Sequence, residues 1–200
     1  MLRSFFGLAI LSVALMISNQ AKADVLYDNG AIDGYTTAST INRVYSVSDS
    51  FTLASDAKLT GAQHVGLWVS TSATPTSVEW SLGTTAFASD LGSGTSSISG
   101  VYENSANSSL DVYDSSFSLN GILHGGTFFL TLHDAIASDG GLVYWDQNRG
   151  PSTAEQAYVG SIPSESFQLV GSLVPEPSAF ALVCVGLVTG LVALRRKRAA

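Results

Sequence analysis

The sequence is poor in cysteine and in positive charge. Its only cysteine, Cys184, lies in a hydrophobic run near the C-terminus, so the region before that run has no disulfide to stabilise it. Only three of the nine lysines and arginines lie between residues 24 and 173, where fifteen carboxylates leave a net charge near −12. We expect no nucleic-acid partner, because phosphates would be repelled by so acidic a surface.

The region 24–173 also lacks helical periodicity and internal repeats, although its length of about 150 residues suffices for one domain with a core. Apolar side chains instead alternate with polar ones, which is typical of strands that bury one face and expose the other. The alternating segments are residues 45–53, 65–69, 78–82, 128–133 and 167–169.

Turn signals separate these segments at intervals of about 8 to 14 residues. The pairs Asn29-Gly30 and Asn120-Gly121 can adopt the positive φ angles that tight hairpins need. Residues 88–109 are dominated by Ser, Gly and Asn, and we expect loops there around a short strand near 98–102. Many short strands with regular turns predict an all-β fold, a single antiparallel β-sandwich that is jelly-roll-like.

The last stretch of the chain has three parts in order. Its start is Val174-Pro175-Glu176-Pro177-Ser178, an apolar run follows over residues 179–194, and Arg195-Arg196-Lys197-Arg198 comes last. As a helix the run would span roughly 24 Å, short of the ~30 Å hydrocarbon core, but flanking cations can snorkel and bilayers can thin. Since cations beside a span stay in the cytoplasm, the preceding domain is expected to face outward.

The first 23 residues predict a secretory signal peptide. Arg3 precedes a short apolar core, and Ala21 and Ala23 form an Ala-x-Ala cleavage site before Asp24. The predicted organisation is therefore a signal peptide at 1–23, an extracytoplasmic domain at 24–173 and a membrane tail at 174–198, whose transmembrane helix covers 179–194.

The tail resembles the PEP-CTERM sorting signal in its proline-flanked glutamate, short hydrophobic helix and terminal basic cluster. The resemblance covers about 25 of the 200 residues. It implies a Gram-negative bacterial protein that an exosortase processes near Pro175-Glu176-Pro177, transient residence in the inner membrane, and a place at the cell surface or in an exopolysaccharide matrix. The same tail is also linked by name to ice-binding proteins, but no regular Thr-x-Thr array supports that activity here.

The middle of the chain bears a weaker resemblance to extracellular domains that carry this tail. The resemblance lies in Ser50-Phe51-Thr52-Leu53, the segments 78–82 and 126–132, Tyr144-Trp145-Asp146 and residues 163–167. It implies architecture and location and no chemistry. Asp146 and Asn148 are expected to hydrogen-bond nearby backbone in a polar loop.

A search for catalytic patterns leads us to expect no enzyme. There is no Gly-x-Ser-x-Gly elbow, and the three histidines, His64, His124 and His133, show no metal-type spacing. Glu79, Glu103 and Asp146 could in principle supply the carboxylate pair of a glycosidase, but spacing alone cannot bring them together.

Two binding features are expected instead. Trp68, Trp145 and Asp146 are candidates for a ligand surface, because an exposed indole can stack on a sugar; Trp68 falls opposite the apolar face of its strand, and burial would make it a core residue. No cofactor is expected apart from Ca²⁺, which oxygen ligands of residues 28–34 could bind if this loop is more than a plain turn.

Two functions follow. One is a non-catalytic surface or matrix protein that an exosortase releases from the inner membrane. The other is a carbohydrate-binding module, or a weak polysaccharide hydrolase, that the same route delivers to exopolysaccharide.

Overall fold

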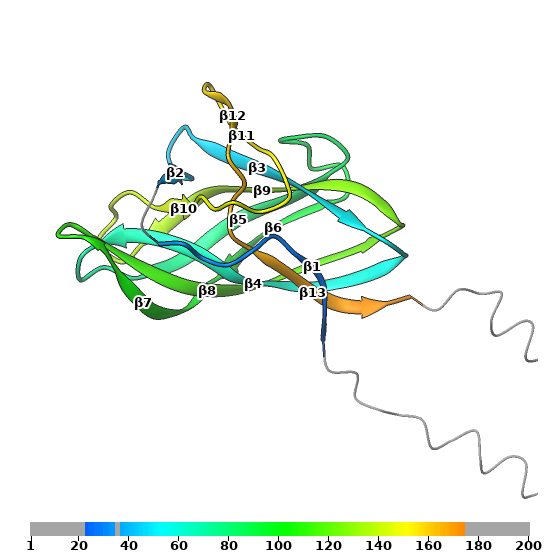
Figure 1. Cartoon of the computed structure of the whole chain (residues 1–200), viewed down its shortest axis with the longest axis horizontal. Helices are drawn as coiled ribbons and strands as arrows, with labels where there is room; N and C mark the ends of the chain where they lie inside the picture. The colour runs from blue at the N-terminus through cyan, green and yellow to red at the C-terminus, as the bar shows by residue number, and fades with distance from the viewer. Residues whose placement is uncertain (1–22, 35–36, 175–200) are drawn as a thin grey trace, which may run out of the picture.

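The computed structural model describes residues 23–34 and 37–174, which form an all-β structure of two antiparallel sheets (Figure 1). The predicted all-β class is confirmed for this part of the chain. No helix within these residues is long and apolar enough to cross a membrane.

One sheet has seven strands, and β4 is its main organising strand because β13, β8 and β10 all pair with it. Along one path the order is β1-β13-β4-β10-β2, and β7 joins through β8. The strands are β1 (Asp24–Asp28), β2 (Ala38–Thr40), β4 (Ala57–Ser70), β7 (Ser99–Asn107), β8 (Leu110–Leu123), β10 (Tyr144–Asp146) and β13 (Gln168–Leu173).

The other sheet has six strands in the order β12-β11-β3-β9-β5-β6. These are β3 (Ser46–Leu53), β5 (Pro75–Gly83), β6 (Gly92–Ser97), β9 (Gly126–Ala137), β11 (Ala154–Gln156) and β12 (Gly160–Ile162). The β11–β12 hairpin projects beyond the body of the domain (Figure 1).

The core contains most of the apolar side chains that the alternation assigns to buried faces; Tyr45 is an exception, since it precedes β3 and is 39% exposed. Residues Val78, Trp80 and Leu82 of β5 lie in one hydrophobic cluster with Leu130 and Leu132 of β9. Val65, Leu67 and Val69 of β4 join the cluster from the opposite sheet. The hydrophobic effect therefore stabilises the two sheets against each other, because each strand contributes one apolar face.

Two local expectations are wrong. Asn120-Gly121 lies within β8, and the chain turns between Leu123 and Gly126 instead. Gly121 lacks a side chain where a Cβ would come within 2.9 Å of Leu82 Cδ1, so packing across the sheets accounts for this glycine.

The strand expected near 98–102 is present as the start of β7, but the rest of residues 88–109 is not mainly loop, because β6 forms as well and β7 continues to Asn107. Their Ser- and Gly-rich sequence has little apolar surface to bury, and both strands pair at an edge of a sheet, β6 with β5 and β7 with β8. Such strands are stabilised by backbone hydrogen bonds to a neighbouring strand, so a search for alternating hydrophobic residues does not detect them.

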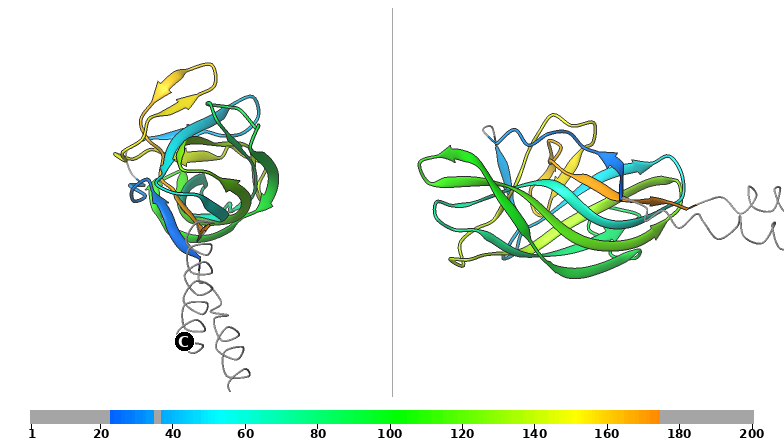
Figure 2. Two further views of the ribbon diagram at one scale, coloured as in Figure 1. Left: turned by 90° about the vertical axis from the view of Figure 1, so that its right-hand side faces the viewer. Right: turned by 90° about the horizontal axis from the view of Figure 1, so that it is seen from below.

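The two ends of the described domain emerge close together. β1 pairs with β13, and Asp24 is the register partner of Gly171 (Figures 1 and 2). Ala23 and Val174 are exposed or nearly so, and the Val174 amide donates to the carbonyl of Asp56 at 2.9 Å. Ala21, residues 175–178, the predicted transmembrane helix and the basic cluster at 195–198 lie outside the described residues.

Candidate functional site

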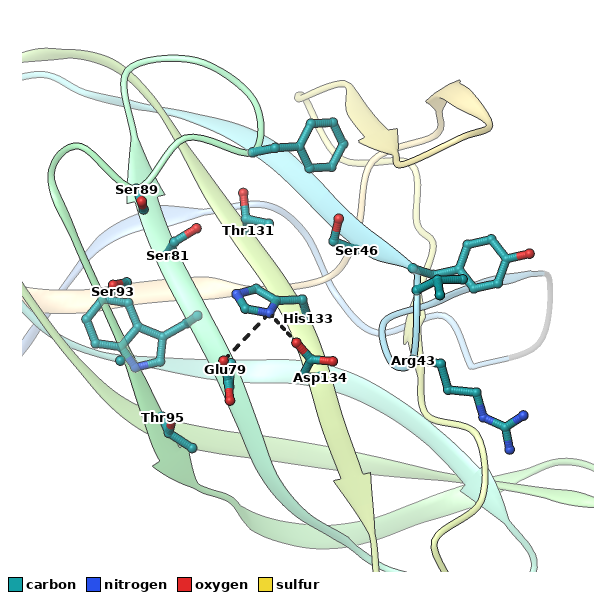
Figure 3. A pocket seen from close by; sticks show the side chains of 15 residues that line it. Arg43, Ser46, Glu79, Ser81, Ser89, Ser93, Thr95, Thr131, His133 and Asp134 are labelled. Atoms are coloured by element: carbon teal, nitrogen blue, oxygen red, sulfur yellow. Dashed lines mark hydrogen bonds and ion pairs between the residues drawn. The ribbon is translucent and has the colours of Figure 1, made fainter.

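A groove of about 600 Å³ runs over the outer face of the six-stranded sheet (Figure 3). Its floor comes from β3, β9, β5 and β6, and its sides come from residues 43–45 and the loop between β5 and β6. The strands present here the face that points away from the core, so the alternation that builds the core also determines what lines the groove.

The floor is rich in hydroxyl groups. Ser46, Ser81 and Thr131 come from three adjacent strands, and Ser93 and Thr95 extend the row onto β6 (Figure 3). Ser81 and Thr131 are buried, and the Thr131 hydroxyl donates to the Ser48 hydroxyl at 2.9 Å. The hydroxyls of Ser46, Ser93 and Thr95 are the more exposed ones and could hydrogen-bond a polar ligand.

Two half-exposed aromatic side chains lie at the sides of the groove. Tyr45 and Phe87 each expose 39% of their surface, and both line the groove. Phe87 has a φ of 63°, and its amide donates to the Ser48 hydroxyl at 3.2 Å, which anchors the loop to β3. The aromatic ring is therefore presented by a constrained loop.

That loop is closed by a second set of hydrogen bonds. The Thr84 amide donates to Asp90 Oδ1 at 3.0 Å, and the Thr84 hydroxyl donates to Asp90 Oδ2 at 2.8 Å. Both bonds favour the ionised carboxylate and lower the pKa of Asp90.

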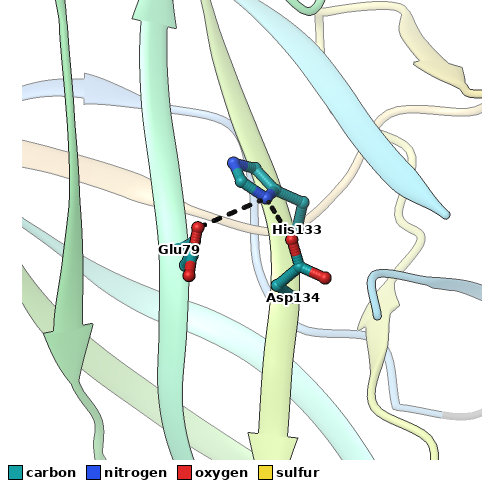
Figure 4. Close-up of side chains that lie close together, drawn as sticks. All are labelled: Glu79, His133 and Asp134. Carbon is teal, nitrogen blue, oxygen red and sulfur yellow. Dashed lines mark hydrogen bonds and ion pairs between the residues drawn. The ribbon is translucent and has the colours of Figure 1, made fainter. Parts of the chain in front are cut away.

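Three ionisable side chains converge on the floor of the groove (Figure 4). His133 Nδ1 lies 2.9 Å from Asp134 Oδ2 and 3.8 Å from Glu79 Oε2. Glu79 and His133 are register partners on adjacent strands. Each of the three offers a ligand atom, and these atoms lie within 4.8 Å of one another. Chemically, the cluster can donate and accept hydrogen bonds or bind a cation.

A bulge in β9 places Asp134 on this face. Between the pairs Ser77–Ile136 and Glu79–His133, β9 has one residue more than β5. Asp134 is the extra residue, because Leu132 and Ala135 both lie in the core while His133 and Asp134 both lie outside it. Its φ of 45° lies in the left-handed region, which one type of bulge uses.

The sequence-predicted surface of Trp68, Trp145 and Asp146 is buried. Trp68 exposes 6% of its surface and Trp145 none. The Trp145 indole donates to the Ser166 carbonyl at 2.8 Å, and the Trp68 indole donates to Asp146 Oδ1 at 2.8 Å. Neither ring offers a face to a ligand in this structure.

Trp68 does lie opposite the core face of β4, as the alternation predicts, but the chain covers that outer face as well. Gly66 leaves the necessary space, since a Cβ there would come within 2.6 Å of Asp146 Cβ. Asp146 also accepts hydrogen bonds from the amides of Asp33 and Gly34 at 2.9 and 3.0 Å. Burial raises the pKa of Asp146 to about 6 despite these donors.

The polar groups of the 28–34 loop are engaged largely within the protein. Asp28 Oδ1 accepts from the Gly30 amide at 2.9 Å, and Asp28 Oδ2 accepts from Gln168 Nε2 at 3.0 Å. The Asn29 side chain is buried and donates to Asp49 Oδ2 at 2.9 Å. Calcium binding by this loop stays a prediction.

The three carboxylates considered for glycoside hydrolysis are not brought together. Glu79 lines the groove, Glu103 lines a separate hollow beside His64, and Asp146 is fully buried in the other sheet. Asn148 acts as expected, because its side chain donates to the Asn29 carbonyl at 2.8 Å and accepts from the Gly150 amide at 2.9 Å.

The groove cluster was missed by sequence reasoning. The alternation does put Glu79 and His133 on the polar faces of their strands, but 54 positions separate them and only strand register pairs them. The extra residue that turns Asp134 outward leaves no recognisable signal in the sequence, because an Asp at that position also fits a plain strand end.

The chain was compared with protein-family models and with curated proteins. No protein-family model matches the chain, and a search of curated proteins finds no match. The class that the fold defines is an all-β protein of two antiparallel sheets with a polar groove on one outer face.

Proposed function

We propose that this chain is an exported, non-catalytic protein of the cell surface or extracellular matrix, and that its groove binds a polysaccharide chain. The observation that carries the binding role is the groove itself, which has accessible hydroxyls at Ser46, Ser93 and Thr95 and two half-exposed aromatic rings at its sides. Sugar rings combine an apolar face with a rim of hydroxyls, and such a lining can contact both.

The export route is part of the same proposal and is supported by the sequence. A signal peptide at 1–23 directs the jelly-roll-like domain at 24–173 out of the cytoplasm. The helix at 179–194 and the cations at 195–198 hold it in the inner membrane of a Gram-negative bacterium. An exosortase-type enzyme then processes it at Pro175-Glu176-Pro177.

The position of the chain ends fits this topology. The described part ends next to the turn between β8 and β9, since Leu173 pairs with Ala57 and Ala57 pairs with Leu123. His133 lies seven residues along β9 from Gly126, about 24 Å at the rise of an antiparallel strand. An anchored protein would thus hold the groove away from its attachment point.

A binding assay with exopolysaccharide tests the proposal. The mature protein should be retarded in gels that contain the polysaccharide of the producing bacterium. We expect Phe87→Ala to weaken binding about two- to tenfold, the range expected for one lost aromatic contact of about 0.5–1.5 kcal/mol.

Tyr158→Ala is the matched control. Tyr158 is 87% exposed at the tip of the β11–β12 hairpin and does not line the groove. Equal losses from the two variants, or no retardation of folded wild-type protein, would count against the groove. Release of soluble sugar from the polysaccharide would contradict the non-catalytic role.

A further inference from the structure

We propose that Glu79, His133 and Asp134 form a binding site for Zn²⁺ or a similar imidazole-preferring divalent cation on the floor of the groove. The site would supply one nitrogen and two oxygen ligands. This inference stands on the geometry of the three side chains and holds whether or not the groove binds a polysaccharide.

The other histidines provide an internal comparison. His64 Nδ1 lies 2.8 Å from Asp114, and His124 Nδ1 lies 2.8 Å from Asp56. Each of these is a pair. Within the described residues, His133 is the one histidine that also has a second carboxylate within 4.0 Å, and the one that belongs to a three-ligand group.

The distances suit a tetrahedral ion. Ligands that bind Zn²⁺ at 2.0–2.2 Å in a tetrahedron lie roughly 3.3–3.6 Å from one another. The two measured separations from His133 Nδ1, 2.9 Å to Asp134 and 3.8 Å to Glu79, lie on either side of that range. To hold the ion, the Asp134 oxygen has to move slightly away from His133 Nδ1 and the Glu79 oxygen slightly toward it.

The backbone already holds the ligands on one face. Glu79 and His133 are cross-strand partners, and neighbouring strands impose a fixed spacing. Consecutive strand residues normally point to opposite faces, so Asp134 could not join His133 on a regular strand. The bulge at Asp134 removes this obstacle.

The exchange of proton for metal balances. A carboxylate oxygen can only accept, so His133 Nδ1 carries the proton in the 2.9 Å hydrogen bond to Asp134. On binding, the neutral ring gives the Nδ1 proton to solvent and takes one from solvent on Nε2, so Nδ1 donates its lone pair to the ion while the ring stays neutral and no net proton is released. Three protein ligands leave the fourth position for water or for a ligand oxygen from the groove.

Calorimetric titration of the purified full-length chain in detergent with zinc chloride tests the site. We expect one ion per chain, and His133→Ala should weaken binding by about tenfold or more. Glu79→Gln and Asp134→Asn should each weaken it while preserving shape. Asparagine is chosen at position 134 because it tolerates the left-handed backbone there.

His64→Ala and His124→Ala are the matched controls and should leave the affinity unchanged. Wild-type affinity in a His133→Ala protein with normal thermal unfolding would overturn the proposal, as would an equal loss from either control. Excess Ca²⁺ should not displace the bound Zn²⁺, because Ca²⁺ prefers oxygen ligands to imidazole. Displacement would contradict ligation by His133.

Discussion

At the scale of single residues, the most unusual feature is a set of buried carboxyl groups. Glu165 is fully buried, and neither of its carboxyl oxygens has a hydrogen-bond partner of standard geometry. Asp49 is also fully buried and uses only Oδ2, which accepts from Asn29 and from the Glu165 amide at 2.9 and 2.7 Å. Burying a carboxylate without a cation is costly, so burial favours the protonated form of such groups.

The pKa values follow from this burial. Burial raises the pKa of Glu165 well above its ordinary value, and the charges of Asp49 and Asp146 raise it further, while the Ser39 hydroxyl opposes the shift. Burial likewise raises the pKa of Asp49 to about 6, although Asn29 and the Glu165 amide donate to its carboxylate.

These shifts predict that the domain is more stable in mild acid than at neutral pH. The groups concerned are Asp49, Asp146 and Glu165. In the unfolded chain their carboxyl groups release their protons near pH 4, whereas in the folded domain they keep them to about pH 6 or beyond. Their contribution to stability is therefore complete below about pH 4 and is lost as the pH rises through the folded-state pKa values. The thermal midpoint of unfolding should be higher at pH 5 than at pH 7.5.

Replacing Glu165 by glutamine tests whether ionisation of this buried carboxyl group lowers the stability at neutral pH. Glutamine keeps the shape and cannot ionise, so Glu165→Gln should raise the unfolding free energy at pH 7.5 and flatten its dependence on pH. Glu155→Gln, at an exposed position of β11, should change neither. If the Glu165→Gln protein were less stable than wild type at pH 7.5, ionisation of Glu165 would not be the cause of the lower stability at neutral pH.

At the scale of strands and sheets, bulges and glycines decide how the strands fit. The β13–β4 ladder shifts register between Val170 and Gly171, and Gly171 is enclosed between β1 and β4. A Cβ at Gly171 would overlap the Lys58 carbonyl oxygen and come within 2.8 Å of Leu26 Cδ1. The obstacle on one side is backbone, which cannot rotate away.

We therefore expect Gly171→Ala to lower the unfolding free energy by on the order of 3 kcal/mol, because β13 must separate from β4. Denaturant unfolding measures the change. Gly125→Ala is the control: its nearest contact would be 3.4 Å, an ordinary van der Waals distance. Similar stability of the Gly171→Ala protein and wild type would show that the ladder relaxes around the new methyl group.

At the scale of the whole molecule, the two sheets separate a buried core from a polar outer face that carries the groove. The described chain ends lie together at one end of the domain, so one attachment point leaves the groove accessible. The excess of carboxylates in residues 24–173 is compatible with the proposed export.

The proposed processing predicts a defined product. Mass spectrometry of the exported protein should find a C-terminus near Val174, and Glu176→Ala should leave full-length protein in the inner membrane, because the proposed recognition motif is lost. Glu155→Ala, an exposed change within the domain, should leave processing intact. Intact tails in a cell that contains the processing enzyme would contradict the proposal.

Much of the architecture could be predicted because alternation is a local property. The pattern at Val78, Trp80 and Leu82 correctly places all three in the core, and the pattern at 65–69 correctly puts Trp68 on the opposite face. The polar edge strands β6 and β7 could not be predicted in the same way, since neighbouring strands rather than their own side chains hold them.

By itself, the sequence determined the all-β class and which residues of the main strands face inward. The reason is that apolar and polar residues alternate with a period of two along these strands, and this pattern is visible without the fold. Only the tertiary structure decided that Asp146 and the 33–34 backbone cover Trp68, and that Glu79 meets His133 and Asp134 in the groove. Those contacts depend on strand register, a bulge and a covering loop, which join residues far apart in sequence and leave no periodic trace in it.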